Sequence, residues 1–204
     1  AVAEKLDPES LYITARQTFL ELLLSGVTSV GEFHYLHRQA SGVPYADREA
    51  MAKALLQAAL ETGIRLVLLR TTYLQGDFDQ ALDAVQQRFS DGSVENSLRA
   101  FETLDAYATS LGNSRLSVGL AAHSLRAVKP KDIVTLKTAY GAKPLHLHVS
   151  EQIREVETCI AKHGCRPIEL LSKLGILDSC TTLVHATHAN LAELELIALN
   201  GTHV

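Results

Sequence analysis

The chain has 204 residues, 47% of them hydrophobic, and a net charge of −4, which together indicate one domain with a large core. This charge gives no basic field of the kind that binds nucleic acid, and no apolar run is long enough to cross a bilayer. The sequence shows no secretory leader, and three cysteines are too few and too odd in number for a disulfide framework. We therefore expect a cytoplasmic protein with reduced thiols and with neither a nucleic-acid nor a membrane partner.

Helical and strand-like segments alternate along the first half of the chain. Apolar residues recur at helical spacing in some segments and run almost continuously in others, with Gly or Pro between them. Asp47 is expected to cap a helix that Gly63 ends. In chain order, the patterns predict a helix over 8–24, a strand over 27–34, a helix over 47–62, a strand over 64–69 that reaches towards 73, and a long loop over 75–93 that contains a helix.

The second half repeats this alternation and includes one strand that ends in polar residues. His146 and His148 alternate with apolar residues, so both imidazoles are expected on one face of that strand. The predicted elements are a helix over 95–110, a strand over 116–122, a helix over 130–140 ended by Gly141, a strand at 145–149, a helix over 152–162, a second helical stretch after Gly164, a strand over 181–186, a helix over 191–199 and the start of another strand at 202–204.

Repeated strand–helix units indicate a parallel α/β sheet that is covered on both faces. An open doubly wound sheet and a closed (β/α)8 TIM-type barrel both fit this pattern. No Gly-x-Gly-x-x-Gly follows a strand, which counts against a dinucleotide-binding fold. Polar residues at the ends of several strands are the expected layout of a barrel, and we favour the barrel. These residues are Glu32, His34, Tyr35, His123, Arg126, His148, Glu151, His185 and His188.

Four strand-end motifs carry a resemblance to a known family. They are Glu32-Phe33-His34-Tyr35-Leu36-His37, His123-Ser124-Leu125-Arg126, His146-Leu147-His148-Val149-Ser150-Glu151 and Val184-His185-Ala186-Thr187-His188. In this order they resemble the amidohydrolase superfamily and, within it, the formimidoylglutamate deiminases of histidine degradation. The resemblance implies a metal-dependent hydrolase that converts N-formimidoyl-L-glutamate and water to N-formyl-L-glutamate and ammonia, and it implies a homodimer.

The same resemblance implies that the chain is incomplete. A barrel typically takes about 250 residues, and residues 1–204 match an incomplete barrel domain with about strands 2 to 6 and the start of strand 7. Relatives of this type hold one divalent metal, usually zinc, through a His-x-His after strand one, a histidine on strand five and an aspartate on strand eight. His148 matches the strand-five ligand. Because a catalytic zinc site needs about three protein ligands, the chain alone is expected to bind metal weakly and to be inactive.

The resemblance also assigns catalytic roles to two residues. Glu151 matches the carboxylate that takes a proton from the attacking water and passes it to the departing nitrogen; the alternative is an acid that stabilises a helix N-terminus. His185 matches the strand-six histidine that steadies the tetrahedral centre, with a buried structural histidine as the alternative. Period-two alternation puts His188 on the opposite face from His185, so His188 is expected to be structural.

Substrate binding is expected from Arg126 together with His123 and Tyr35. An arginine can hold a carboxylate by two parallel hydrogen bonds, and the implied substrate carries two carboxylates. A merely solvated arginine is the alternative. The remaining histidines divide into a group that faces inward and whose role stays ambiguous, with a supporting place around the metal ligands as one alternative, and a group without a role. The ambiguous ones are His34, His37 and His146, and those without a role are His163 and His203.

Two other functional hypotheses stay open at this point. The first is another aminohydrolase of the superfamily, acting on a purine or triazine ring, which would have little use for Arg126. The second is a non-catalytic fragment or scaffold that lacks the remaining metal ligands.

Overall fold

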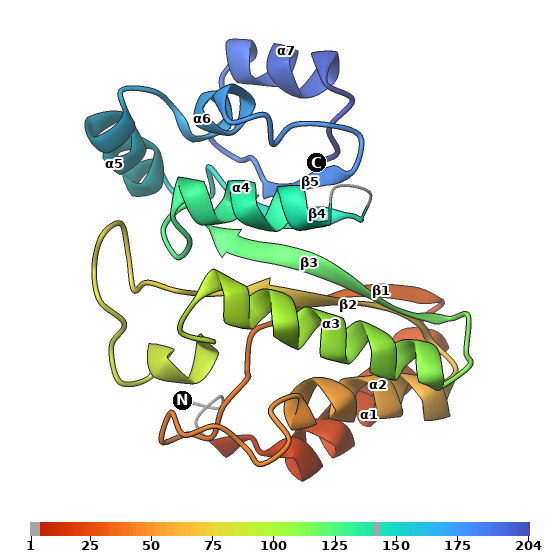
Figure 1. Ribbon diagram of the computed structural model, residues 1–204. Helices are drawn as coiled ribbons and strands as arrows, with labels where there is room; N and C mark the ends of the chain where they lie inside the picture. Colours follow the sequence, from red (N-terminus) through yellow and green to blue (C-terminus); the bar gives the residue numbers. More distant parts are fainter. Residues whose placement is uncertain (1–4, 141–142) are drawn as a thin grey trace. The chain divides into compact units, whose positions relative to one another are not determined.

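The computed structural model of the chain describes residues 5–140 and 143–204. Helices follow strands along the sequence, and the strands are hydrogen-bonded in the order β1-β2-β3-β4-β5 (Figure 1). The β1–β2, β3–β4 and β4–β5 pairs are parallel, which confirms the predicted α/β class. The elements are α1 (Pro8–Leu24), β1 (Ser29–His34), α2 (Ala50–Thr62), β2 (Arg65–Thr72), the 3₁₀ helix η2 (Gln86–Phe89), α3 (Val94–Ser110), β3 (Leu116–Ser124), α4 (Pro130–Ala139), β4 (Leu145–Val149), α5 (Ile153–His163), α6 (Pro167–Lys173), β5 (Thr181–His185) and α7 (Leu191–Leu199).

The chain divides into two compact units. The first unit comprises Ala1–Thr71 and Leu82–Gly119, and the second comprises Thr72–Ala81 and Leu120–Val204. Strand β3 passes from one unit into the other, so the division falls within an element and not in a linker. The prediction of one domain over residues 1–204 stays a prediction.

In the first unit, the helices form where local capping and apolar spacing favour them. Asp7 caps α1 by accepting the Ser10 N–H at 2.8 Å, and Pro8 takes the first helical position, where a missing N–H costs nothing. Helices α1 and α2 pack side by side (Figure 1). The Leu66 N–H donates to the Arg115 carbonyl at 2.9 Å, where β2 meets β3.

In the second unit, strand β4 shows the alternation that the sequence predicts. Leu145, Leu147 and Val149 are buried, while His146 and His148 are half-buried. The segment that leads in from β2 is held by two N–H groups, of residues 74 and 75, which both donate to the Ala127 carbonyl. His203 forms a parallel bridge with Thr182 of β5, as expected for the first residues of another strand.

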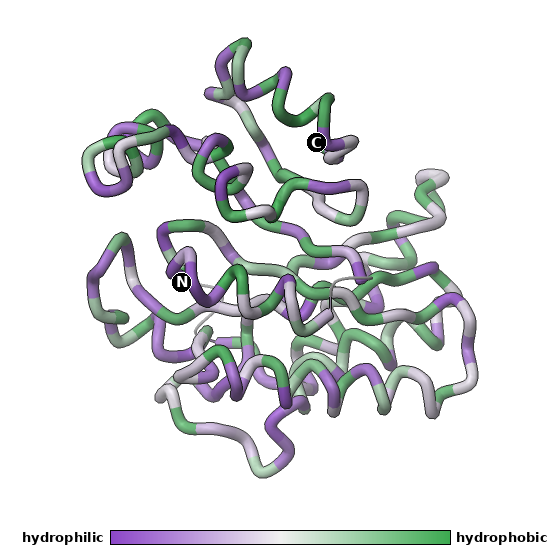
Figure 2. Tube along the Cα trace, turned by 45° about the horizontal axis from the view of Figure 1, so that its top comes forward, coloured by the Kyte–Doolittle hydropathy of each residue, from purple (hydrophilic) through white to green (hydrophobic). Residues whose placement is uncertain are grey.

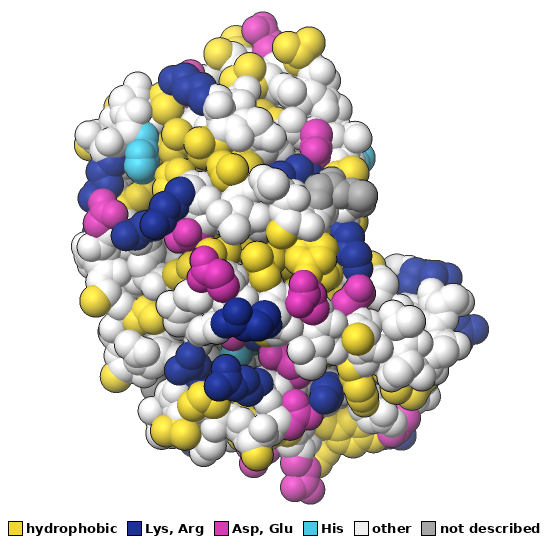
Figure 3. All heavy atoms as spheres, viewed as in Figure 1, with side chains coloured by type: hydrophobic (Ala, Val, Ile, Leu, Met, Phe, Trp, Pro, Cys, Tyr) yellow, Lys and Arg dark blue, Asp and Glu magenta, His cyan; other side chains and the backbone are white. Residues whose placement is uncertain are grey.

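The helices carry both hydrophobic and hydrophilic residues along their length (Figure 2). Positive and negative side chains are interspersed on the face in view in Figure 3. None of the helices within the described ranges combines the length and apolar content needed to span a membrane. All three cysteines are free thiols, with Cys159 and Cys165 buried.

Two sequence predictions need correction or qualification. Helix α2 begins at Ala50 and not at Asp47, because the Asp47 side chain accepts the Glu49 N–H at 3.0 Å in a local turn that precedes the helix. The helix predicted inside 75–93 is the short η2, and Arg88 holds it by donating to the Arg38 carbonyl at 2.8 Å. Gly141, the predicted end of α4, lies outside the described residues.

Candidate active site

Three imidazoles lie next to one another at the strand ends of the second unit. His123 comes from β3, His148 from β4 and His185 from β5. The ring centroids of His123 and His148 are 5.0 Å apart, and those of His148 and His185 are 5.4 Å apart with the rings nearly parallel. Parallel strands with their carboxyl ends at one edge bring these side chains together, although the residues are up to 62 positions apart in sequence (185 − 123 = 62).

The hydrogen bond of His148 fixes which ring nitrogen is basic. Its Nδ1 lies 2.8 Å from the backbone carbonyl oxygen of His123. A carbonyl only accepts, so Nδ1 donates and the lone pair of the neutral ring is on Nε2. Burial lowers the pKa of His148, which favours the neutral ring. An imidazole that donates through one nitrogen to a carbonyl is the usual form of a metal-ligating histidine, so His148 fits the ligand role.

Arg126 and Glu151 form an ion pair beside these rings. The Arg126 Nη2 donates to Glu151 Oε2 at 3.1 Å, and Glu151 Oε1 lies 3.9 Å from His185 Nε2. The side chains of Arg126, Glu151 and His185 are 26%, 34% and 40% exposed, so all three remain reachable by a small molecule. The Glu151 charge also raises the pKa of His148, against the larger lowering effect of burial. The structure thus brings His123, Arg126, Glu151 and His185 together around His148.

One donor of this cluster is buried without an acceptor. Arg126 Nε is inaccessible and has no hydrogen-bond partner within the described ranges. A buried donor without an acceptor is costly, by about 1–3 kcal/mol. The Arg126 backbone is held in place, because its carbonyl accepts the Gln75 Nε2–H at 2.9 Å. Because Nε is enclosed, a further acceptor would meet the guanidinium at its exposed part, since the side chain as a whole is 26% exposed.

His123 is held in its neutral form. Burial, followed by the nearby His148 and Arg126, lowers the pKa of His123 to about 3. Its Nδ1 lies 3.1 Å from the Ser124 hydroxyl, and its ring packs edge-on against Tyr73 at 4.7 Å. At neutral pH His123 can therefore offer a hydrogen bond but not a positive charge.

Strained backbone gathers at these strand ends. Three of the four non-glycine residues with positive φ in the described residues are Ser150 (50°), His185 (77°) and Ala186 (47°). Such conformations cluster at functional sites. These conformations also end β5 at His185, so the alternation of side chains along a strand does not extend to His188. The prediction that His188 lies on the opposite face of the strand from His185 therefore does not apply. His188 uses its main chain instead, donating its N–H to the Ser150 carbonyl at 3.0 Å.

The other predicted residues lie in different surroundings. Tyr35 belongs to the first unit, where its ring packs edge-on against Phe89 at 5.2 Å, and its role in substrate binding stays a prediction. His34 is 4% exposed and lines a cavity of about 260 Å³. His146 is half-buried on β4, where burial and then His203 lower its pKa.

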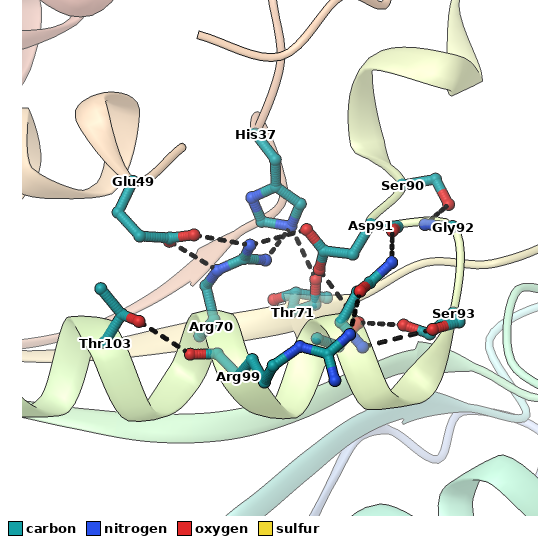
Figure 4. A network of polar contacts seen from close by, with 12 residues as sticks. His37, Glu49, Arg70, Thr71, Ser90, Asp91, Gly92, Ser93, Arg99 and Thr103 are labelled. Carbon is teal, nitrogen blue, oxygen red and sulfur yellow. Dashed lines mark hydrogen bonds and ion pairs between the residues drawn. The ribbon is translucent and has the colours of Figure 1, made fainter. Parts of the chain in front are cut away.

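His37 has a structural setting that the sequence did not reveal. Its Nε2 lies 2.9 Å from the Thr71 carbonyl oxygen and contacts the Arg70 guanidinium (Figure 4). Arg70 in turn forms ion pairs with Glu49 and Asp91, each at 2.9 Å. We refer to Arg70, Glu49, Asp91 and His37 as the buried ionic cluster. The signal for it was an arginine that directly follows the apolar run 66–69.

A complete metal site is not found within the described residues, since no three His, Cys, Asp or Glu side chains there are grouped as metal ligands. His148 can therefore supply one ligand of a larger set. The role of His148 as a metal ligand stays a prediction.

Comparisons with known proteins identify the family of the chain. The model of the amidohydrolase family matches residues 2–204. The chain is 39% identical to the formimidoylglutamate deiminase of Pseudomonas aeruginosa over 97% of its own length and 43% of that protein. It is also similar to a solved amidohydrolase from Brucella melitensis, with a TM-score of 0.91, 35% identity, and coverage of 98% of this chain and 44% of that one.

A more distant structure shares the fold. An adenosine deaminase from Xanthomonas campestris, solved with bound zinc, matches with a TM-score of 0.76 and 21% identity over 98% of this chain and 40% of that one. The chain thus spans less than half the length of the relatives it matches. Its fold is part of the amidohydrolase barrel, as the strand-end motifs predict.

Proposed function

The chain belongs to the amidohydrolase family, and we propose that the protein removes ammonia hydrolytically from N-formimidoyl-L-glutamate, with N-formyl-L-glutamate as the other product. The similarity to the Pseudomonas deiminase supports this substrate, and the family membership supports hydrolysis of a carbon–nitrogen bond. The observation that carries the proposal is the partly exposed Arg126, which is paired with Glu151 beside His185. A substrate carboxylate would accept a charge-assisted hydrogen bond from the exposed part of this guanidinium.

Arg126 and His123 would hold a substrate carboxylate, and Tyr35 is the further group proposed for this task. The Nη2 of Arg126 already donates to Glu151, and the side chain is 26% exposed, so its remaining terminal N–H groups are proposed to meet the substrate. Neutral His123 would add a hydrogen bond without repelling the guanidinium. Because Glu151 holds the guanidinium and Gln75 holds the Arg126 main chain, Arg126 would orient the substrate as well as attract it.

We propose zinc as the cofactor, with His148 as one of its ligands. When bound, zinc supplies activation of the attacking water, whose pKa it can lower from 15.7 to about 7. The hydrogen bond from His148 Nδ1 to the His123 carbonyl orients the ring for this role.

Glu151 and His185 would manage the protons of the reaction. Glu151 takes a proton from the attacking water as the water oxygen bonds to the formimidoyl carbon, and then delivers it to the terminal nitrogen. The remaining proton of the added hydroxyl then also passes through Glu151 to this nitrogen as the carbon–nitrogen bond breaks, so ammonia leaves and the carbon becomes the carbonyl of the formyl group. His185, 3.9 Å from Glu151, would donate a hydrogen bond to the oxygen that carries the developing charge.

Ammonia release by the full-length, zinc-loaded protein tests this proposal directly. N-formimidoyl-L-glutamate should be hydrolysed with a kcat/KM at least about 100-fold above that for adenosine, a neutral ring substrate, because a site whose arginine pairs with a substrate carboxylate discriminates against a substrate that lacks one. Faster turnover of adenosine would favour a ring deaminase instead, and no turnover of either would favour a scaffold.

Metal content provides a separate test of the cofactor. Elemental analysis should find one zinc per active site in the full-length protein, and the His148→Ala variant should retain much less. Equal zinc content in both would contradict the ligand role of His148. The resemblance also supports a homodimer in the cytoplasm, which sedimentation and cell fractionation would check.

A further inference from the structure

A second carboxylate lies directly behind Glu151. Glu155 is in the first turn of α5 and is 2% exposed. Its Oε1 accepts the Ser150 N–H at 3.0 Å and its Oε2 accepts the Glu151 N–H at 3.2 Å. Both oxygens of this buried side chain are therefore bonded to the main chain of the loop between β4 and α5.

This loop needs such a partner because its backbone leaves the strand abruptly. Ser150 has φ of 50°, in the left-handed region that a serine adopts only when its surroundings enforce it. The N–H groups of Ser150 and Glu151 turn away from the sheet ladder, and buried N–H groups require acceptors. On the other side, the Ser150 carbonyl accepts the His188 N–H at 3.0 Å. The turn is thus held both by α5 and by the segment after β5.

Burying a carboxylate costs more free energy than burying an apolar side chain. Burial raises the pKa of Glu155, and only the two N–H donors and the Arg126 charge oppose that effect. A packing role alone would be served better by an apolar side chain, since an acid is costly to bury unless it is hydrogen-bonded. One of the two hydrogen bonds is to the main chain of Glu151 itself. This position indicates that Glu155 serves the loop that carries Glu151.

We propose that Glu155 is the positioning residue that locks the main chain of Ser150 and Glu151 and so aims the Glu151 carboxylate at Arg126 and His185. The proposal rests on the proposed function, since it is the role of Glu151 that makes this orientation matter. Glu155 touches neither the substrate nor the metal in this scheme. It acts only through the loop that it holds.

Amide hydrogen exchange in the full-length protein tests the positioning itself, whether or not the protein is a deiminase. In the Glu155→Gln variant, one of the two N–H groups would face an amide NH₂ instead of an oxygen. The Ser150 and Glu151 amides should therefore exchange at least about 10-fold faster than in the wild type, while amides in the middle of α5 stay protected, as expected for a local opening. The matched control is Glu157→Gln on the same helix, whose exposed side chain should leave these amides unchanged.

Kinetics then connects the loop to the reaction. Glu155→Gln should lower kcat about 10–100-fold, the usual cost of removing a group that orients an active-site residue, and should leave KM for N-formimidoyl-L-glutamate within about threefold, because Arg126 still binds the substrate. Glu157→Gln should leave both constants unchanged.

Four results separate the proposals. Unchanged Ser150 and Glu151 amides in Glu155→Gln would overturn the positioning role, as would a loss confined to KM. Faster exchange of all α5 amides together would also overturn it, because that pattern reports general destabilisation. If the wild type released no ammonia but the two amides still responded to Glu155→Gln, the proposed function would fail and the lock on the loop would stand.

Discussion

The two units of the chain use the same kinds of side chain in opposite ways. In the first unit, Arg70 is 1% exposed and each of its two carboxylate partners lies 2.9 Å away (Figure 4). In the second unit, Arg126 is 26% exposed, and within the described residues its ion pair is with one carboxylate, that of Glu151. The charge of an arginine that is buried between two carboxylates is matched within the fold. An arginine whose donors are only partly matched has capacity left for a ligand.

The histidines of the buried ionic cluster and of the candidate active site differ in the same way as the two arginines. In the buried ionic cluster, burial is the main effect that lowers the pKa of His37 to about 3, and its Nε2 is occupied by the Thr71 carbonyl. In the second unit, the bond from His148 Nδ1 leaves the lone pair on Nε2, and His185 is 40% exposed. Composition alone does not separate the two clusters; exposure and the completeness of pairing do.

The largest expected effect is on catalysis, at Glu151. Glu151→Gln removes the proton carrier but keeps the shape of the side chain, so kcat for ammonia release should fall about 10²–10⁴-fold. Thermal unfolding should hardly change, because the ion pair with Arg126 is partly exposed and such pairs contribute about 1 kcal/mol or less. A loss of stability without a loss of kcat would place Glu151 with the structural acids.

A comparable effect, on stability instead, is expected at Arg70. Arg70→Met leaves the carboxylates of Glu49 and Asp91 buried without their partner, which should lower the free energy of unfolding by about 3–5 kcal/mol. Arg126→Met should lower it by about 1 kcal/mol or less. Urea unfolding of the two variants would show whether the contrast holds, and equal losses would abolish it.

The difference between Arg70 and Arg126 should also appear in substrate affinity. Arg126→Ala should raise KM for N-formimidoyl-L-glutamate about 10–100-fold, because a charge-assisted hydrogen bond to the carboxylate contributes about 1.5–3 kcal/mol. Arg126→Lys should recover only part of this, since an ammonium lacks the planar pair of donors. Any turnover of a neutral amidine should be spared in both variants, and a parallel loss for the neutral compound would argue against carboxylate binding.

The smallest effect is a pH dependence of stability in the first unit. Burial would raise the pKa of Asp91, but the Arg70 charge, His37 and hydrogen bonds outweigh it and lower the pKa to about 2 from the usual 3.8. A lowered pKa stabilises the fold above the unfolded value, and that contribution of about 2 kcal/mol is lost as the pH falls from about 4 to 2. Unfolding free energies of the wild type should therefore fall more steeply over this range than those of Asp91→Asn. Parallel curves would contradict the assignment.

Local sequence patterns determined the elements and the order of the site residues. The bounds predicted for α1 and α7 are those observed, since Asp7-Pro8 and Asn190 supply strong N-terminal signals. The alternation of His146 and His148 with apolar residues also predicted their shared face. Capping, turn chemistry and periodicity act over a few residues and can be read directly from the chain.

Only the tertiary structure determined which charged residues are buried beside opposite charges and which stay partly exposed to a ligand. The partners of Arg70 are 21 positions away on either side, and no role was predicted from the sequence for Glu155, which accepts the Glu151 N–H. The alternation of side chains along a strand also could not predict the course of the chain after His185, because left-handed backbone ends the strand there. Burial and hydrogen-bond pairing depend on what the fold brings together in space, and no local pattern contains that information.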